Sequence, residues 1–111
     1  MLVLVLALMA GCKAKEEKKP AVVEKMAPEE IQRDQDACKA YVDKICACTV
    51  PDAKKQCELA RALPEAIRIG LEVAASPDSK PDVVRQSLDG VRKTAKECIE
   101  QIAKLPAMGC Q

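Results

Sequence analysis

The sequence contains no histidine, no tryptophan and no phenylalanine, and Tyr41 is the only aromatic residue among its 111 residues. Without histidine the chain lacks the commonest general base, and with it every Ser–His or Cys–His nucleophile pair. Without further aromatic rings it lacks the platforms on which single-stranded nucleic acids stack. We therefore expect a protein that is not an enzyme.

Net charge is also nearly absent, because 18 Lys and Arg residues oppose 17 Asp and Glu residues for a formal charge of +1. A nucleic-acid partner is not expected, since such proteins carry a clear basic excess. Only four glycines occur, and no glycine-rich phosphate loop is among them. No cofactor and no small-molecule substrate are indicated.

Paired carboxylates are the remaining catalytic possibility, because two of them can hydrolyse glycosides. Two such pairs are Asp34 with Asp36 and Glu97 with Glu100. Their spacing is typical of a solvated helix face. We interpret them as surface residues.

The first ten residues, MLVLVLALMA, form an uninterrupted apolar run that Gly11 and Cys12 follow. A helix that spans a bilayer needs about 20 apolar residues, so this run is too short. Its length fits the hydrophobic region of a secretory signal peptide, and Ala10 and Gly11 are small enough for cleavage after them. We expect residues 1–11 to be a signal peptide.

The stretch Leu8-Met9-Ala10-Gly11-Cys12 resembles the lipobox of bacterial lipoproteins. In that family a diacylglycerol is attached to the cysteine thiol, the signal is cut just before the cysteine, and the new amine is usually acylated. The resemblance implies lipidation of Cys12, with palmitate as an expected fatty acid, and a membrane partner through that lipid. It departs from the family at Met9, where leucine is preferred.

The resemblance has further consequences and one alternative. No Lys or Arg precedes the apolar run, so we expect the true start to lie upstream. By the family's sorting rule, Lys13 after the cysteine favours the outer membrane where the organism has one, on its periplasmic face. The alternative is a short buried helix or an uncleaved anchor that happens to precede a cysteine.

Residues 12–27 comprise this cysteine and a charged segment that has no helical apolar periodicity and that Pro20 interrupts. We interpret it as a flexible tether with a mean reach of roughly 20 Å and a maximum of roughly 50 Å. A polybasic membrane-binding stretch is an alternative that Glu16 and Glu17 weaken. Its basic residues are Lys13, Lys15, Lys18 and Lys19.

Residues 28–111 are expected to form one small helical domain, beginning with a helix from Pro28 to about Cys46. A second helix, capped by Asp52, is expected to run to about residue 75 and to be kinked or divided at Pro64. Its apolar positions are Leu59, Leu63, Ile67, Leu71 and Ala74.

A third helix is expected after a cap formed by Ser79 and Asp82, with Pro106 and Gly109 stopping it. Its apolar stripe is Val84, Leu88, Val91, Ala95, Cys98, Ile102 and Leu105. No segment alternates with a period of two residues. The sequence therefore predicts an all-α, up-down-up three-helix bundle.

Disulfides are expected because an aliphatic core this small often needs covalent staples. Seven cysteines minus Cys12 leave six: Cys38, Cys46, Cys48, Cys57, Cys98 and Cys110. We predict three bridges. One is Cys38–Cys57, and the others join Cys46 and Cys48 to Cys98 and Cys110 in an order left open.

The leading functional hypothesis is a lipid-anchored cell-envelope lipoprotein whose domain binds a protein partner or has a structural role. An apolar patch around Val73, Ala74 and Ala75, or around Val83, could be a contact site. The alternative is a periplasmic metal- or redox-handling lipoprotein. Its thiolates would come from Cys46, Cys48 and Cys57.

Overall fold

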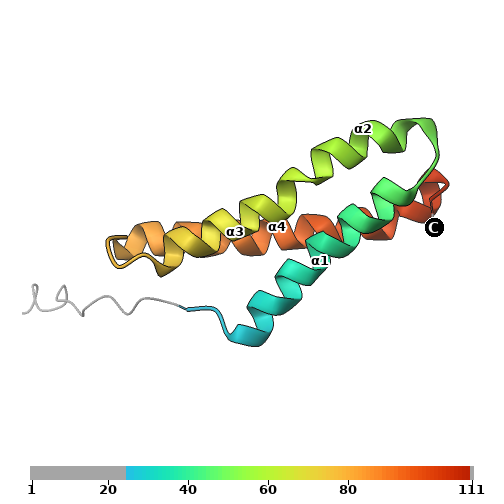
Figure 1. Ribbon diagram of the computed structural model, residues 1–111. Coiled ribbons are helices and arrows are strands. Elements are labelled where there is room, and N and C mark those ends of the chain that lie inside the picture. Colours follow the sequence, from blue (N-terminus) through green and yellow to red (C-terminus); the bar gives the residue numbers. More distant parts are fainter. Residues whose placement is uncertain (1–24, 111) are drawn as a thin grey trace, which may run out of the picture.

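A computed structural model describes residues 25–110, which fold into helices joined by short turns (Figure 1). The helices are α1 (Pro28–Ala47), α2 (Pro51–Ala60), α3 (Ala62–Ala75) and α4 (Pro81–Met108). Since α2 and α3 together form the second arm, this part of the chain is an up-down-up three-helix bundle. It contains no strand and is stapled by three disulfides, so the predicted fold class is confirmed.

Three of the four helices begin with proline: Pro28, Pro51 and Pro81. Proline fits there because an N–H at the first helical position would have no partner within the helix, and because its φ is already helical. The predicted side-chain caps are wrong. Asp52 lies inside the first turn of α2, and the Ser79 hydroxyl instead donates to the Val73 carbonyl at 2.6 Å.

The second arm is divided at Arg61, three residues before Pro64. Proline offers no N–H to the carbonyl four residues earlier, here that of Ala60, and its ring crowds that carbonyl. The predicted division is therefore confirmed, and it falls on the N-terminal side of the proline. The bend lets α2 follow α1 while α3 follows α4.

The third arm extends further than predicted, because Pro106 lies inside α4 and only Gly109 ends the helix. Gly109 has a φ of 96°, which glycine adopts without steric cost. The N–H of Cys110 donates to Leu105 at 2.9 Å and that of Gly109 to Pro106 at 3.1 Å, the pair of bonds of a Schellman motif. This turn directs Cys110 back into the core, where it is buried.

The aliphatic core runs along the bundle, with Ile45, Ile67 and Leu105 among its most buried side chains. α3 and α4 approach closely at Gly70, where an added Cβ would lie 2.7 Å from Val91 Cγ2. Figure 1 shows that the N-terminal half of α1 leans away from the α3–α4 hairpin. The bundle is therefore closed at the α1–α2 turn and forked at the other end.

Candidate functional site

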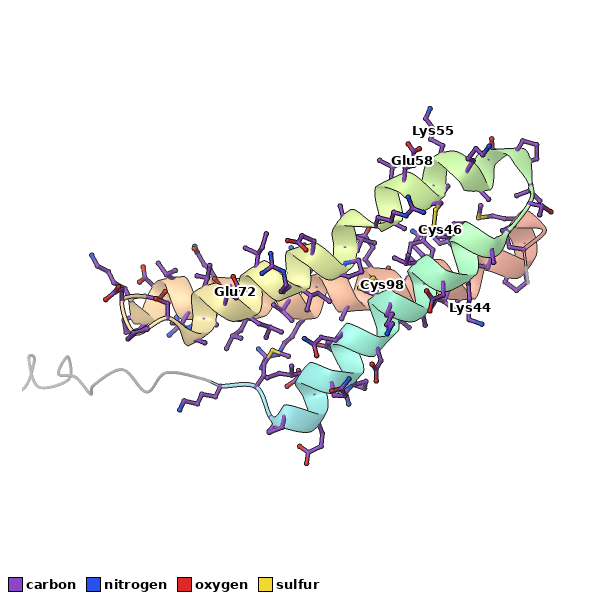
Figure 2. All side chains as sticks on the ribbon, in the orientation of Figure 1. Lys44, Cys46, Lys55, Glu58, Glu72 and Cys98 are labelled. Carbon is purple, nitrogen blue, oxygen red and sulfur yellow. A yellow bond between two sulfur atoms is a disulfide. The ribbon has the colours of Figure 1, made fainter. Side chains whose placement is uncertain are left out.

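All six cysteines of the described residues form disulfides, and two of these cysteines, Cys46 and Cys98, are labelled in Figure 2. The bridges are Cys38–Cys98, Cys46–Cys57 and Cys48–Cys110, with Cα–Cα distances of 5.0, 4.7 and 5.4 Å. Cys48–Cys110 is among the predicted possibilities. The predicted Cys38–Cys57 bridge is wrong, and the joining of Cys46 to a cysteine of α4 is wrong as well.

The observed pairing follows from the position of each cysteine along its helix. A helix rises about 1.5 Å per residue, so Cys38 lies roughly 18 Å before the turn at Val50 and Cys57 only about 10 Å beyond it. Cys46 is much nearer in height to Cys57. Because α1 and α4 run parallel, stepping back from the Cys48–Cys110 bridge along both helices reaches Cys38 and Cys98 at similar heights.

These bridges bear on the thiolate set proposed for metal or redox chemistry. Cys46 and Cys57 are bonded to each other and Cys48 to Cys110, so in this oxidised form none of them offers a thiolate. Among the residues that the structure describes, no cluster of three or more Cys, Asp or Glu side chains is arranged to hold a metal ion. The hollow beside these bridges is lined by side chains of mixed charge, such as Lys54, Glu58 and Arg61.

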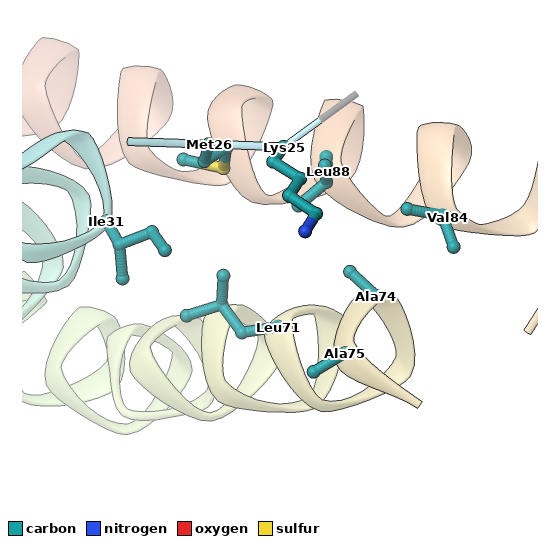
Figure 3. A pocket seen from close by; sticks show the side chains of 8 residues that line it. All are labelled: Lys25, Met26, Ile31, Leu71, Ala74, Ala75, Val84 and Leu88. Atoms are coloured by element: carbon teal, nitrogen blue, oxygen red, sulfur yellow. The ribbon is translucent and has the colours of Figure 1, made fainter. Parts of the chain in front are cut away.

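An apolar groove lies in the fork of the bundle, between the start of α1 and the distal parts of α3 and α4 (Figure 3). Its volume is about 530 Å³. We define the apolar groove by its lining residues: Lys25, Met26, Ile31, Leu71, Ala74, Ala75, Val84 and Leu88. Figure 3 shows α4 side chains along one wall and α3 side chains along the other, with Ile31 closing one end.

The groove is built from one turn of each wall helix. Leu71 and Ala75 are four residues apart on α3, and Val84 and Leu88 are four apart on α4, so each pair lies on one face. Leu88 is 4% exposed and forms part of the core, whereas Ala75 is exposed. The groove thus passes from the core to the surface.

Met26 and Lys25 precede α1 and lie over this groove. Met26 is only 7% exposed, so the packed part of the chain begins before the expected boundary at Pro28. Figure 3 shows the Lys25 side chain in front of the gap between the two walls, and the residue is exposed. Lys25 forms no ion pair or side-chain hydrogen bond with another of residues 25–110. Among the described residues, it is the only charged one that lines the groove.

A polar cluster joins α1 to α4 near the groove. Arg92 Nε donates to Glu30 Oε2 at 2.9 Å, and Arg92 Nη1 lies 3.7 Å from Asp89 Oδ1. Asp34, one turn after Glu30, is 5% exposed, and its Oδ1 lies 3.9 Å from Arg33 Nε. Asp34 Oδ2 is buried without a hydrogen-bond partner among the described residues.

The environment of Asp34 favours its neutral form. Burial raises the pKa of the Asp34 carboxyl above 3.8, and the nearby Glu30 carboxylate raises it further. The guanidinium groups of Arg33 and Arg92 lower that pKa and only partly offset the increase. The folded state therefore binds a proton at Asp34 more tightly than a solvated aspartate does.

The interpretation of the acidic pairs as surface residues is correct for three of the four residues. Glu97 and Glu100 are exposed, and the exposed Asp36 accepts a hydrogen bond from Gln32 Nε2 at 3.0 Å. Asp34 is buried instead, because it occupies the inward face of α1 between Ile31 and Cys38. Ile31, Asp34 and Cys38 are spaced i, i+3, i+7 and so share one helix face. This spacing could have predicted the burial of Asp34 from the sequence.

The suggested apolar patch divides between the groove and the surface. Ala74 and Ala75 line the groove, Val73 is half-buried outside it, and Val83 is 37% exposed on α4. Sequence reasoning missed the roles of Lys25 and Met26, because both lie in the segment interpreted as tether.

Cys12, the expected signal peptide and the expected tether up to Glu24 lie outside the described residues. Within the part that the structure describes, no helix is both long enough and apolar enough to cross a membrane. Comparison of the chain with protein-family models, with curated proteins and with solved structures found no match. Function is therefore inferred from the sequence and from the geometry of the described residues.

Proposed function

We propose that this protein is a cell-envelope lipoprotein, anchored through lipid on Cys12, whose disulfide-stapled helical domain binds a ligand in the apolar groove. The proposal is non-enzymatic. The observation that carries it is the apolar groove itself. Pockets with mainly apolar walls and a few polar groups are the usual form of a ligand site, and about 530 Å³ lies within their usual size range.

The cysteine pairing supports the anchor. The six cysteines between residues 25 and 110 bond to one another, so none of them takes Cys12 as its disulfide partner. Disulfides persist in oxidising compartments such as the bacterial periplasm, which agrees with export. Cys12 then remains for the lipid that the Leu8–Cys12 resemblance implies.

The tether supports the placement of the groove near a membrane. Twelve residues lie between Cys12 and Lys25, and the thirteen steps along the chain span at most about 45 Å. The groove is at the point where the tether enters the domain. An anchored protein would therefore keep this groove within that distance of the membrane surface, with outer-membrane delivery favoured by Lys13.

Metabolic labelling with an alkyne analogue of palmitate tests the anchor. Cells that express the wild-type chain should yield a labelled protein in the membrane fraction, and Cys12→Ala should lose both the label and the membrane association. Cys48→Ala is the matched control, because it removes a disulfide cysteine and should keep the label. Labelled Cys12→Ala, or unlabelled wild type in the membrane fraction, would contradict the proposal.

A further inference from the structure

The lining of the apolar groove restricts the chemical class of its ligand. Apart from Lys25, every lining side chain within residues 25–110 is aliphatic or a thioether, and none of them is aromatic. Such walls offer dispersion contacts and burial but no stacking and no hydrogen-bond pattern. They suit a flexible hydrocarbon chain better than a planar or a polar molecule.

The dimensions of the groove point to a single short chain. Each wall consists of one helical turn, residues 71–75 of α3 and residues 84–88 of α4, and so extends about 6 Å along its helix. Ile31 and Met26 extend the apolar surface at one end. A protein partner would need a larger surface, because specific protein interfaces bury about 800 Å² on each partner.

Lys25 favours a ligand with an anionic head group. Its exposed, positively charged side chain lies at the opening of the groove and lacks an acidic ion-pair partner among the described residues. An anionic head would complement this charge, whereas a cationic head would be repelled. Met26 beside it is unbranched and flexible, so it can adjust to chains of different length.

We propose that the apolar groove binds a single-chain fatty acid, with its carboxylate at Lys25 and its hydrocarbon tail between Leu71 and Leu88. This inference rests on the groove being the binding site of the proposed function, and it names the ligand class. It does not depend on the lipid anchor. The two can therefore fail separately.

Two head groups on the same tail test the charge of the site. Dodecanoate and dodecyltrimethylammonium are titrated, below their micelle concentrations, into the purified full chain carrying Cys12→Ser, with calorimetry as the readout. The wild-type groove should bind dodecanoate more tightly. Lys25→Glu should weaken dodecanoate about 2- to 5-fold and strengthen the cation by a similar factor, the size expected of one exposed ion pair.

A substitution that fills the groove tests whether the hydrocarbon tail binds there. Ala74 lines the groove on α3, so Ala74→Leu places about three more carbon atoms where the tail would lie, and it should weaken dodecanoate about tenfold. Ala66→Leu is the matched control, since Ala66 is exposed on the same helix outside the groove; it should change the affinity less than about twofold. Zero free thiols and an unchanged helical circular dichroism spectrum establish that each variant is folded.

The proposal fails if Lys25→Glu leaves the preference between the two head groups unchanged. Because Lys25 is exposed, this variant should fold, so its affinities can be measured. It also fails if Ala74→Leu and Ala66→Leu have equal effects. Binding to phosphatidylglycerol vesicles without binding of monomeric dodecanoate would assign the surface to a membrane instead. If dodecanoate binds as expected but Cys12 carries no lipid in cells, the anchor fails and the groove assignment stands.

Discussion

The Asp34 carboxylate should destabilise the folded domain at neutral pH, and Asp34→Asn should therefore increase its stability. Asp34 is 5% exposed, and its Oδ2 has no hydrogen-bond partner among residues 25–110. Burial and the Glu30 carboxylate disfavour the charged form of Asp34, and the neutral amide of Asn does not carry this cost. Attraction by Arg33 and Arg92 offsets part of this cost. We expect a net gain of about 1 kcal/mol at pH 7, or roughly 4–8 °C in Tm.

The gain should depend on pH in a defined direction. The folded-state pKa of Asp34 is raised above 3.8, so the folded state holds this proton more tightly than the unfolded state. The stability that protonated Asp34 provides is fully present below about pH 3.8 and is lost as the pH rises through the folded-state pKa. The advantage of Asp34→Asn should accordingly vanish near pH 3 and grow toward neutrality.

Urea unfolding between pH 3 and pH 7, followed by circular dichroism on the disulfide-intact chain with Cys12→Ser, measures this difference. Asp36→Asn is the matched control, because Asp36 is exposed two residues away and should change the unfolding free energy by less than about 0.5 kcal/mol. The reasoning is refuted if Asp34→Asn destabilises the domain at pH 7, or if its effect does not change with pH.

Two further pairs of variants test the helix packing and the disulfides by the same unfolding assay. Gly70→Ala should cost about 1–3 kcal/mol, because its Cβ would lie 2.7 Å from Cγ2 of the buried Val91. Gly90→Ala, with nothing within 4 Å, should instead gain about 0.5–1 kcal/mol; equal signs would contradict the α3–α4 geometry. In the chain-entropy model, removing the bridge with sequence separation 60, Cys38–Cys98, should cost about 4 kcal/mol, and removing the bridge with separation 11, Cys46–Cys57, about 3 kcal/mol. The reverse order would contradict the loop-length argument.

The arms of the bundle could be predicted from sequence because their signals are local. Apolar periodicity located the three arms, and Pro64 predicted the division of the second arm. The helix starts were harder, since Asp52 and Ser79 match capping patterns but the N-cap positions are Val50 and Lys80, each followed by a proline. Pro106 was expected to stop α4. It lies within the last turn, and only Ala107 and Met108 continue the helix beyond it.

The disulfide pairing depends on the position of each cysteine along its helix axis. Sequence separation gives this position only approximately. Treating Cys38 and Cys57 as equally far from the turn produced the wrong Cys38–Cys57 bridge and with it the wrong partner for Cys46. The parallel course of α1 and α4 did predict Cys48 opposite Cys110 as one possibility. A helical-rise estimate would have paired Cys46 with Cys57.

The groove could not be predicted, because it depends on how far α1 diverges from the α3–α4 hairpin. Apolar spacing identified Leu71, Leu88 and the patch near Ala74, but it predicted them as core or as an unranked contact surface. The fork leaves them partly uncovered. Lys25 and Met26 carried no helical periodicity, so only the tertiary structure shows that they line the groove.

Intact mass spectrometry of the chain extracted from membranes tests the proposed lipoprotein most directly. The account predicts a chain that begins at Cys12, carries fatty acyl groups on that residue, and gains no mass when treated with a thiol-alkylating reagent before reduction. After reduction, six alkylation sites should appear, one for each cysteine of the three bridges. A chain that retains residues 1–11 and has an unmodified, alkylatable Cys12 would contradict it.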